Sequence, residues 1–565
     1  MENLFPFISS MKSYDRAKLT KDLAAGLVVG VMLIPQGMAY AMIAGLPPVF
    51  GLYAAIFPSL IYTFLGSSRH VSVGPVAMDS LILFAGISAV AAVGSDQYIA
   101  MAVAITTIVG LIQLTMGLLR MGFLANFLSK PVILGFTFAA AVLISIKQIK
   151  YLIKVEADAS NIFRELAFYF THFHEIHLST FLLSVVSIVV LFFGKKIFPR
   201  IPMSLLVVLL GTLSSFLFDF EQLGIELVGG MPSGFPVFDI PDWEVLPVRQ
   251  LLPLIFTLAL MGFVEVYSIG QRLQSKHKGE YEIDPNRELI GIGAGNIVGS
   301  FFKSFPTTAG FSRSAVNEAS GAQTGLAALV SVLVVIMTLL FLMPAFYYLP
   351  QALLGAIIFV AILGLIDYRL TKKLWKNDKY DFAMLLSSFA GTLILGIEWG
   401  IGVGILLSLV VLIYKTSTPH MAVLGRIEGT SYFRNLNRYD TAIDDPKVSI
   451  LRFDARLFFA NIGSLKSKMD ELVSIKPQLE KIILDAQSIS DIDSSGMEGL
   501  EDLISILKDN QITFHMANII GPVRDKLFIS GLADKIGLEN IHDSIADALM
   551  DHTTNTKLAY QTNIK

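Results

Sequence analysis

Residues 305–321 read FPTTAGFSRSAVNEASG and stand between two strongly apolar stretches of the chain. A proline and a glycine open the stretch, and Arg313, Asn317 and several hydroxyl side chains follow. Broken helices and charged side chains are tolerated at membrane depth only where protein or a water-filled cavity satisfies them. The stretch therefore predicts a short helix that faces a polar cavity inside a membrane protein.

A second break of the same character, GSSRHVSVGP at 66–75, also leads into a short apolar segment. Placing residues 51–77 over 291–317 without gaps pairs Ser72 with Ser312. Each break comes in the third span of a set of seven, and an odd number of spans inverts the second set in the membrane. We therefore expect an inverted repeat in which two half-helix ends face each other near the midplane.

The composition is that of a membrane protein, since 54% of the 565 residues are hydrophobic and only 16% are charged. A helix needs roughly 20 apolar residues to cross a hydrocarbon core of about 30 Å. About fourteen candidate segments follow one another along the chain, two of them short. They lie at about 22–43, 47–66, 74–92, 97–119, 127–146, 178–198, 202–219, 251–271, 285–302, 312–322, 323–343, 350–366, 380–397 and 398–415.

Basic residues gather at alternate ends of these segments and predict the orientation. They precede the first span and follow the fourth, sixth, eighth and twelfth, whereas the acidic loop 220–245 precedes the eighth. By the positive-inside rule, the basic ends and both termini are cytoplasmic. The N-terminus has no signal-peptide pattern and is interpreted as a retained interfacial segment of a cell-membrane protein.

Several function classes are excluded or disfavoured. The net charge of -3, without a clustered basic face, predicts no nucleic-acid partner. The chain has no cysteine, which excludes disulfides and thiolate chemistry. GIGAGNIVG at 291–299 lacks the strand and last glycine of a dinucleotide fingerprint and is interpreted as a close-packing helix face. No Walker motif or serine-hydrolase elbow is present.

We expect no enzyme activity, no cofactor and no metal site. The loop THFHEIHLS does offer four side chains that could bind a metal, namely His172, His174, Glu175 and His177.

Beyond about residue 420, charges become frequent and two patterns alternate. VSILRFDARLFF, KIILDAQSI and ITFHMANI are typical of strands, whereas SLKSKMDELVSI, SSGMEGLEDLISILKDN and GPVRDKLFISGLADKI are typical of helices. We therefore predict four parts, namely a cytoplasmic N-terminal segment (1–21), a transmembrane domain (22–415), a cytoplasmic α/β domain (420–555) and a flexible tail (556–565).

The two breaks together predict an anion site. The start of a helix directs unpaired N–H groups and the positive end of the helix dipole at the break, and Arg313 adds a charge. Further donors are expected around both breaks, from Val73, Gly74, Val76, Ser312 and Ser314. The alternative is that Arg313 is an interhelical clamp or a snorkelling anchor.

Two carboxylates lie in apolar helical sequence. Glu265 has no basic residue within a helical turn, so its carboxyl group binds a proton more readily than it would in water. It is the candidate for binding a coupling ion, and the alternative is a packing hydrogen bond from a permanently neutral acid. Asp79 is a second candidate for coupling, but it could equally pair with Arg313 or face a cytoplasmic crevice.

Four stretches together resemble one known family. They are GFVEVYSIGQ, GFSRSAVNEASG, ISDIDSSG and the block DLAAGLVVGVMLIPQGMAYAMIAGLPPVFGLYAAIFPSLIYTFLGSSRHVSVGPVAMDS at 22–80. The chain resembles the sulfate permease (SulP) family of anion transporters, which carry a C-terminal STAS domain. This resemblance implies a seven-plus-seven inverted repeat with core and gate domains, an anion site between the third and tenth helices, and homodimers. GFSRSAVNEASG is more similar to the family's sulfate carriers than to its bicarbonate branch.

The resemblance also implies roles for individual residues. Gln36 and Tyr40, in PQGMAY, match positions that line the anion pocket, although a kink at Pro35 and simple packing would also explain them. Glu265 matches the position of coupling-ion carboxylates. Ser495 matches the STAS serine that is phosphorylated in stand-alone bacterial relatives.

The expected function is proton-coupled sulfate symport by an elevator-like movement of the core against the gate. The alternatives are a sodium- or proton-coupled bicarbonate or dicarboxylate transporter, an anion exchanger or channel, a voltage-responsive motor, and a receptor-like protein whose STAS domain senses the membrane part. The expected partners are an inorganic oxyanion, a co-transported proton (with sodium as the alternative), the lipid bilayer, a second copy of the chain, and a cytoplasmic regulator at the STAS domain.

Overall fold

The computed structural model describes residues 7, 14–127, 130–157, 162–198, 203–277, 279–363, 368–395 and 397–550. These residues belong to two compact units, Met1–Ser408 and Leu409–Lys565, and the division falls within one helix. The tail expected at 556–565 and most of the segment 1–13 lie outside the described residues.

The first unit is helical, and each of the fourteen expected segments contains a helix. Six helical stretches are long and apolar enough to cross a membrane, and several shorter apolar helices accompany them among the described residues. The helices are α2 (Arg16–Ile43), α3 (Val49–Tyr53), α4 (Phe57–Leu65), α5 (Ala77–Ile87), α6 (Asp96–Leu118), α7 (Lys130–Ile153), α8 (Ile162–Thr171), α9 (Leu178–Ile197), α10 (Met203–Phe218), α11 (Val248–Gln274), α12 (Pro285–Ser300), α13 (Phe311–Ala319), α14 (Leu326–Met337), α15 (Gln351–Leu363), α16 (Tyr368–Asn377), α17 (Lys379–Leu395) and α18 (Ile397–Ser417).

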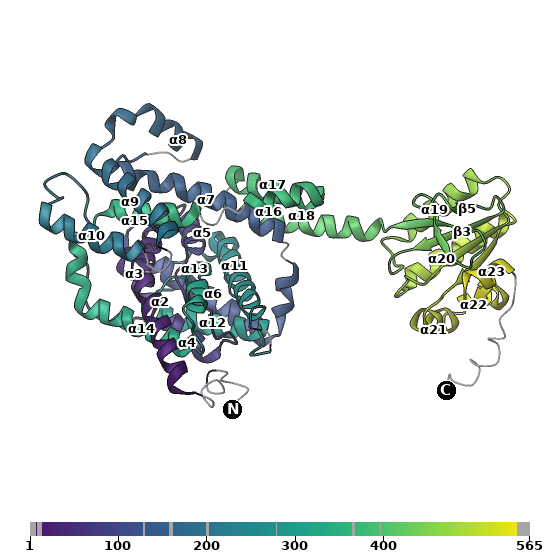
Figure 1. Ribbon diagram of the computed structural model, residues 1–565, viewed down its shortest axis with the longest axis horizontal. Helices are drawn as coiled ribbons and strands as arrows, with labels where there is room; N and C mark the ends of the chain where they lie inside the picture. The colour runs from purple at the N-terminus through teal and green to yellow at the C-terminus, as the bar shows by residue number, and fades with distance from the viewer. Residues whose placement is uncertain are drawn as a thin grey trace. The chain divides into compact units, whose positions relative to one another are not determined.

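Most helices of this unit, drawn in Figure 1 from purple to green, pack in two groups, and α2 contacts members of both. In the first group, here called the core group, α12 packs on α4 and α6, α14 packs on α2, and α11 packs on α5 and α6. In the second, here called the gate group, α7 packs on α9, α15 and α17, and α10 packs on α9. This is the core and gate division expected of the inverted repeat.

Glycines allow the core group to pack closely. A Cβ atom on Gly110 of α6 would lie 2.7 Å from the carbonyl oxygen of Gly293 in α12. A Cβ on Gly51 would lie 1.8 Å from the carbonyl oxygen of Gly37. Any larger side chain would push these backbones apart. The prediction that GIGAGNIVG forms a close-packing helix face is confirmed.

Both predicted breaks are present, but the ungapped pairing of the two halves is wrong. Ser72, which was paired with Ser312, instead precedes strand β1 (Val73–Gly74), and the equivalent strand β2 is Thr308–Ala309. The helix after each strand begins at Ala77 or Phe311. The equivalent positions are therefore five or six residues away from the ungapped register. The loops before the two strands, 66–72 and 301–307, have the same length, so the few identities selected the wrong register.

The second unit is an α/β domain. Its sheet has the strand order β4-β3-β6-β7-β8-β9, with β5 also paired to β3. Strands β6 to β9 are parallel, and β3 is antiparallel to β4, β5 and β6. The elements are β3 (Met421–Ile427), β4 (Phe433–Asn435), β5 (Ala442–Ile443), β6 (Val448–Phe453), α19 (Ile462–Ile475), β7 (Lys481–Asp485), α20 (Ser494–Asp509), β8 (Thr513–Ala517), α21 (Gly521–Ile529), α22 (Leu532–Ile536), β9 (Ile541–His542) and α23 (Ile545–Met550).

The three predicted strands and three predicted helices of this unit are confirmed, with one difference. The stretch predicted as a single helix from Gly521 forms α21 and α22, because Gly531 adopts a left-handed conformation with φ of 75° between them. Strands β3, β4, β5 and β9 were not predicted. Strands β4, β5 and β9 have only two or three residues, too few to show an alternation of apolar and polar residues. Strand β3 has seven residues and lies between β4 and β6, inside the sheet.

Candidate functional site

The two breaks meet in a small antiparallel ladder. Val73 pairs with Ala309 and Gly74 pairs with Thr308. Each strand leads almost at once into a short helix, β1 into α5 and β2 into α13. Because the strands are antiparallel, the two helices leave the ladder in opposite directions. Both of their N-termini, with N–H groups that no side chain caps, therefore lie at the ladder.

Hydrogen bonds fasten this ladder to the core group. The Thr308 hydroxyl donates to the carbonyl oxygen of Gly262 in α11, 2.6 Å away. The backbone N–H and the hydroxyl of Thr307 both donate to Asn296 Oδ1 of α12, at 3.0 and 2.8 Å. Asn296 Nδ2 in turn donates to Gln113 of α6. The position of the breaks is thus set by buried polar groups on three helices.

Arg313 is the buried cation of the site, with 1% of its surface exposed. Its Nη1 donates a hydrogen bond of 2.9 Å to the carbonyl oxygen of Pro75, which precedes α5. Its Nε and Nη2 have no hydrogen-bond partner among the described residues. Leaving a buried donor unpaired costs free energy. The two unpaired groups of the guanidinium are therefore available to donate hydrogen bonds to a ligand.

Two glycines leave space for this guanidinium. A Cβ atom on Gly310 would lie 2.6 Å from Cζ of Arg313, and one on Gly74 would lie 3.4 Å from its Nη2. Gly74 is the last residue of β1, and Gly310 is the N-cap residue of α13. Any other residue at Gly310 would collide with the arginine, so the breaks supply room as well as backbone donors.

Helix α2 contributes Gln36 and Tyr40 just after its internal proline, Pro35. Both side chains are buried, and Gln36 Oε1 has no partner among the described residues. The Tyr40 hydroxyl interacts electrostatically with Arg313 and with Glu265. The structure thus brings Tyr40 of α2 and Glu265 of α11 close to the arginine.

One carboxylate, Glu265, lies near the arginine, and a second, Asp79, lies near Glu265. Glu265 of α11 interacts electrostatically with both Arg313 and Asp79. Asp79, in the first turn of α5, is 2% exposed. One oxygen of each carboxylate, Glu265 Oε2 and Asp79 Oδ1, has no hydrogen-bond partner among the described residues. The site therefore combines one cation with two acids that have free positions to bind a proton or a cation.

The remaining predicted residues are placed differently. The Ser314 hydroxyl accepts a 2.9 Å hydrogen bond from the backbone N–H of Ser72, so it fastens one break to the other. Ser312 is exposed, on the opposite side of α13 from the buried Arg313. Val76 precedes α5, and its carbonyl oxygen accepts hydrogen bonds from Ser80. Ser495 lies in the first turn of α20, in the second unit.

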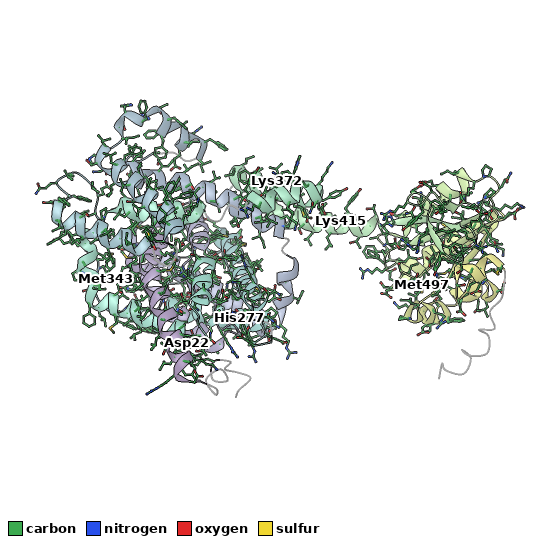
Figure 2. All side chains as sticks on the ribbon, in the orientation of Figure 1. Asp22, His277, Met343, Lys372, Lys415 and Met497 are labelled. Carbon is green, nitrogen blue, oxygen red and sulfur yellow. The ribbon has the colours of Figure 1, made fainter. Side chains whose placement is uncertain are left out.

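A buried polar cluster around His70, in the first break, was not predicted from the sequence. His70 Nδ1 lies 2.9 Å from the Tyr281 hydroxyl, and His70 Nε2 lies 3.0 Å from the carbonyl oxygen of Ala322. The rings of His70 and His277 stack with centroids 4.3 Å apart. Figure 2 shows His277 at the margin of the helical unit. The only signal in the sequence was an isolated histidine in a polar loop.

The predicted histidine-rich loop makes local contacts. The His172 ring stacks on Phe168, and His177 Nδ1 lies 2.8 Å from the Thr180 hydroxyl. Among the described residues of the chain, no three histidine, aspartate or glutamate side chains lie close enough together to bind one metal ion.

Comparison with known proteins gives a consistent result. The profile of the sulfate permease family matches residues 19–388, and the profile of the STAS domain matches residues 441–548. The chain is 35% identical to sulfate transporter 4.1, chloroplastic, of Arabidopsis thaliana, over 96% of this chain and 82% of the relative. It is 30% identical to high affinity sulfate transporter 2 of Stylosanthes hamata, over 98% of this chain and 87% of the relative.

Solved structures show the same architecture. The structure of SLC26A9 superposes with a TM-score of 0.89 and 25% identity, covering all of this chain and 94% of the other. The transmembrane domain of the cyanobacterial bicarbonate transporter BicA superposes with a TM-score of 0.59 over 70% of this chain and 98% of the other. At 22% identity, the latter supports the fold alone.

Proposed function

The chain belongs to the sulfate permease family, and on this premise we propose that it is a secondary active transporter that carries sulfate together with protons. It is a multi-pass membrane protein and an anion transporter by its family. The choice of sulfate is supported by relatives that are named as sulfate transporters and match nearly the whole chain.

The observation that carries the proposal is the unpartnered part of Arg313. Its free Nε and Nη2 lie beside two uncapped helix N-termini. A planar guanidinium matches the oxygen atoms of an oxyanion, and the helix ends add backbone donors. A single arginine among neutral donors also allows release, which a cluster of cations would oppose.

The two acids supply the coupling step in this proposal. Glu265 takes up a proton from one side of the membrane and releases it to the other, with Asp79 as the second candidate. The proton offsets part of the anion's charge while both are in the low-dielectric interior. The closeness of Glu265 to Arg313 supports a direct effect of protonation on anion affinity.

An elevator-like movement fits the way in which the site is fastened. The hydrogen bonds that hold the two breaks run to α11 and α12, both in the core group. Tyr40 and Gln36 also belong to a core helix. The whole site can therefore move as one body against the gate group, with the anion between the N-termini of α5 and α13.

We further propose that the protein lies in the cell membrane with both termini cytoplasmic, and that it forms homodimers. The distribution of basic residues supports this orientation. The C-terminal α/β domain, including Ser495, would bind a cytoplasmic regulator rather than the anion.

Uptake into proteoliposomes tests the proposal. Labelled sulfate, bicarbonate, fumarate and chloride are compared, each with a proton or a sodium gradient imposed separately. We expect an inward proton gradient to accelerate sulfate uptake, and sodium to have no effect. Uptake of bicarbonate or fumarate in place of sulfate would assign the chain to the alternative transporter class. Sulfate flux insensitive to both gradients would indicate an exchanger or channel.

A further inference from the structure

Helix α16 carries all of its basic side chains on one face. Arg369, Lys372, Lys373 and Lys376 follow the spacing i, i+3, i+4 and i+7, which places them along one side of a helix. All four are exposed, and the helix contains no acidic residue. Within the described ranges, no ion pair joins any of the four to another side chain. The face is therefore a row of cations without a protein partner.

The remaining arc of α16 is apolar and aromatic. Tyr368 is 72% exposed and Trp375 is 62% exposed, and Leu370 and Leu374 lie between them on the helix. The edge of Trp375 contacts the ring of Phe382 in α17, with centroids 4.7 Å apart. No residue of α16 is buried. The helix thus presents a basic face and an aromatic face that is largely exposed, and α17 contacts part of the second.

In the chain, α16 lies between two apolar helices of the membrane unit. It follows α15 and precedes α17, which are both apolar helices of the membrane unit. Figure 1 shows α16 beside α17, and Figure 2 shows Lys372 at the margin of this region. The nearest following acid, Asp378, uses its Oδ1 to accept the backbone N–H groups of Tyr380 and Asp381. This oxygen thereby caps α17.

We propose that α16 lies in the membrane–water interface and binds the headgroups of anionic phospholipids. Tyrosine and tryptophan are the side chains that favour this interface, and a basic amphipathic helix lies in its plane with the cations toward the phosphates. Each basic residue near an anionic surface strengthens the local preference for such lipids by about fivefold. The partner is the lipid surface itself, and the recognised group is a phosphodiester.

Tryptophan fluorescence tests this proposal in the full-length protein. The chain has three tryptophans, so Trp243→Phe with Trp399→Phe leaves Trp375 as the only emitter. This variant is placed in nanodiscs of equimolar phosphatidylcholine and phosphatidylglycerol. In one sample the phosphatidylcholine carries bromine, which quenches tryptophan fluorescence. In the other sample the phosphatidylglycerol carries it. The bulk composition is the same in both, so any difference reports which lipid is enriched at α16.

We expect brominated phosphatidylglycerol to quench Trp375 several-fold more strongly than brominated phosphatidylcholine. Lys372→Gln with Lys373→Gln and Lys376→Gln should bring the ratio to about one, whereas arginine at the same positions should keep it. A matched control replaces three lysines of the second unit, Lys466, Lys468 and Lys535, and should leave the ratio unchanged. Equal quenching by the two lipids before any lysine is replaced, or no quenching by either, would overturn the proposal.

Discussion

Nη1 of Arg313 lies 2.9 Å from the carbonyl oxygen of Pro75, a residue 238 positions earlier in the chain. This hydrogen bond connects the start of one short helix to the residue that precedes the other. The two halves of the membrane unit therefore share one buried cation. Because Nε and Nη2 are free among the described residues, the same side chain can join the halves and bind a ligand between them.

Arg313→Ala should weaken sulfate binding by about tenfold or more, since each charge-assisted hydrogen bond contributes roughly 1.5–3 kcal/mol. Arg313→Lys should recover only part of this loss, because it keeps the charge but not the planar fork. Calorimetric titration of the purified variants with sulfate gives the affinities. Arg249→Ala, which removes an exposed arginine, is the matched control. An unchanged affinity in folded Arg313→Ala would make the arginine an interhelical clamp.

Glu265→Gln should abolish the acceleration of uptake by an inward proton gradient and leave the exchange of anion for anion intact. The amide has the shape of the protonated acid but cannot release a proton. Uptake and exchange are measured on the same proteoliposomes. If the proton gradient still drives the variant, the coupling role moves to Asp79, and Asp79→Asn is then compared in the same assay.

Ser314→Ala should lower the free energy of unfolding by about 1–3 kcal/mol, because it leaves the buried N–H of Ser72 without its acceptor. Ser312→Ala, two residues away on the exposed side of α13, should change the stability by less than about 0.5 kcal/mol. Thermal unfolding in detergent compares the pair. Equal losses in the two variants would show that the Ser72 contact is not what stabilises the break.

Acid should weaken the packing of the loop around His70, which lies between α4 and α5 outside the helices. Burial, and next the neighbouring His277, lower the pKa of His70 from 6.5 to about 4. The unfolded chain therefore takes up a proton in this range before the folded chain does, and the contribution of His70 to stability falls as the pH drops from about 6.5 towards 4. At about pH 5 the loss is about 2 kcal/mol.

His70→Gln isolates this effect, because glutamine does not titrate. Tyr281, Glu280, Glu318 and Lys276 surround the histidine pair and remain in both proteins. The difference between the unfolding midpoints of wild type and variant should therefore change as the pH is lowered. Parallel pH curves for the two proteins would rule out His70 as the titrating group.

Deletion of residues 420–565 should leave sulfate binding to the purified membrane unit intact and lower its turnover. All of the candidate anion ligands lie within the first unit. Calorimetry and uptake on the truncated protein separate binding from transport. Loss of binding from a well-folded truncation would assign the C-terminal domain a direct part in the site.

The sequence by itself determined where the membrane helices begin and where two of them break. Long apolar runs and proline–glycine clusters act over a few residues, so the segments around Pro75 and Pro306 could be located without their neighbours. The same local signals predicted the alternating strands and helices after residue 420. Resemblance then linked these patterns to an anion transporter.

Tertiary structure decided which side chains meet. Ser312 and Ser314 look equivalent in the sequence, yet one is exposed and the other accepts the N–H of Ser72. The face that a residue of α13 presents depends on where α13 lies in the bundle, and that is set by contacts with residues over 200 positions away. Two further contacts join the two halves of the chain. They are the ladder between β1 and β2 and the hydrogen bond from Arg313 to Pro75. A single sequence carries no local trace of such pairings, because they exist only once both halves are packed.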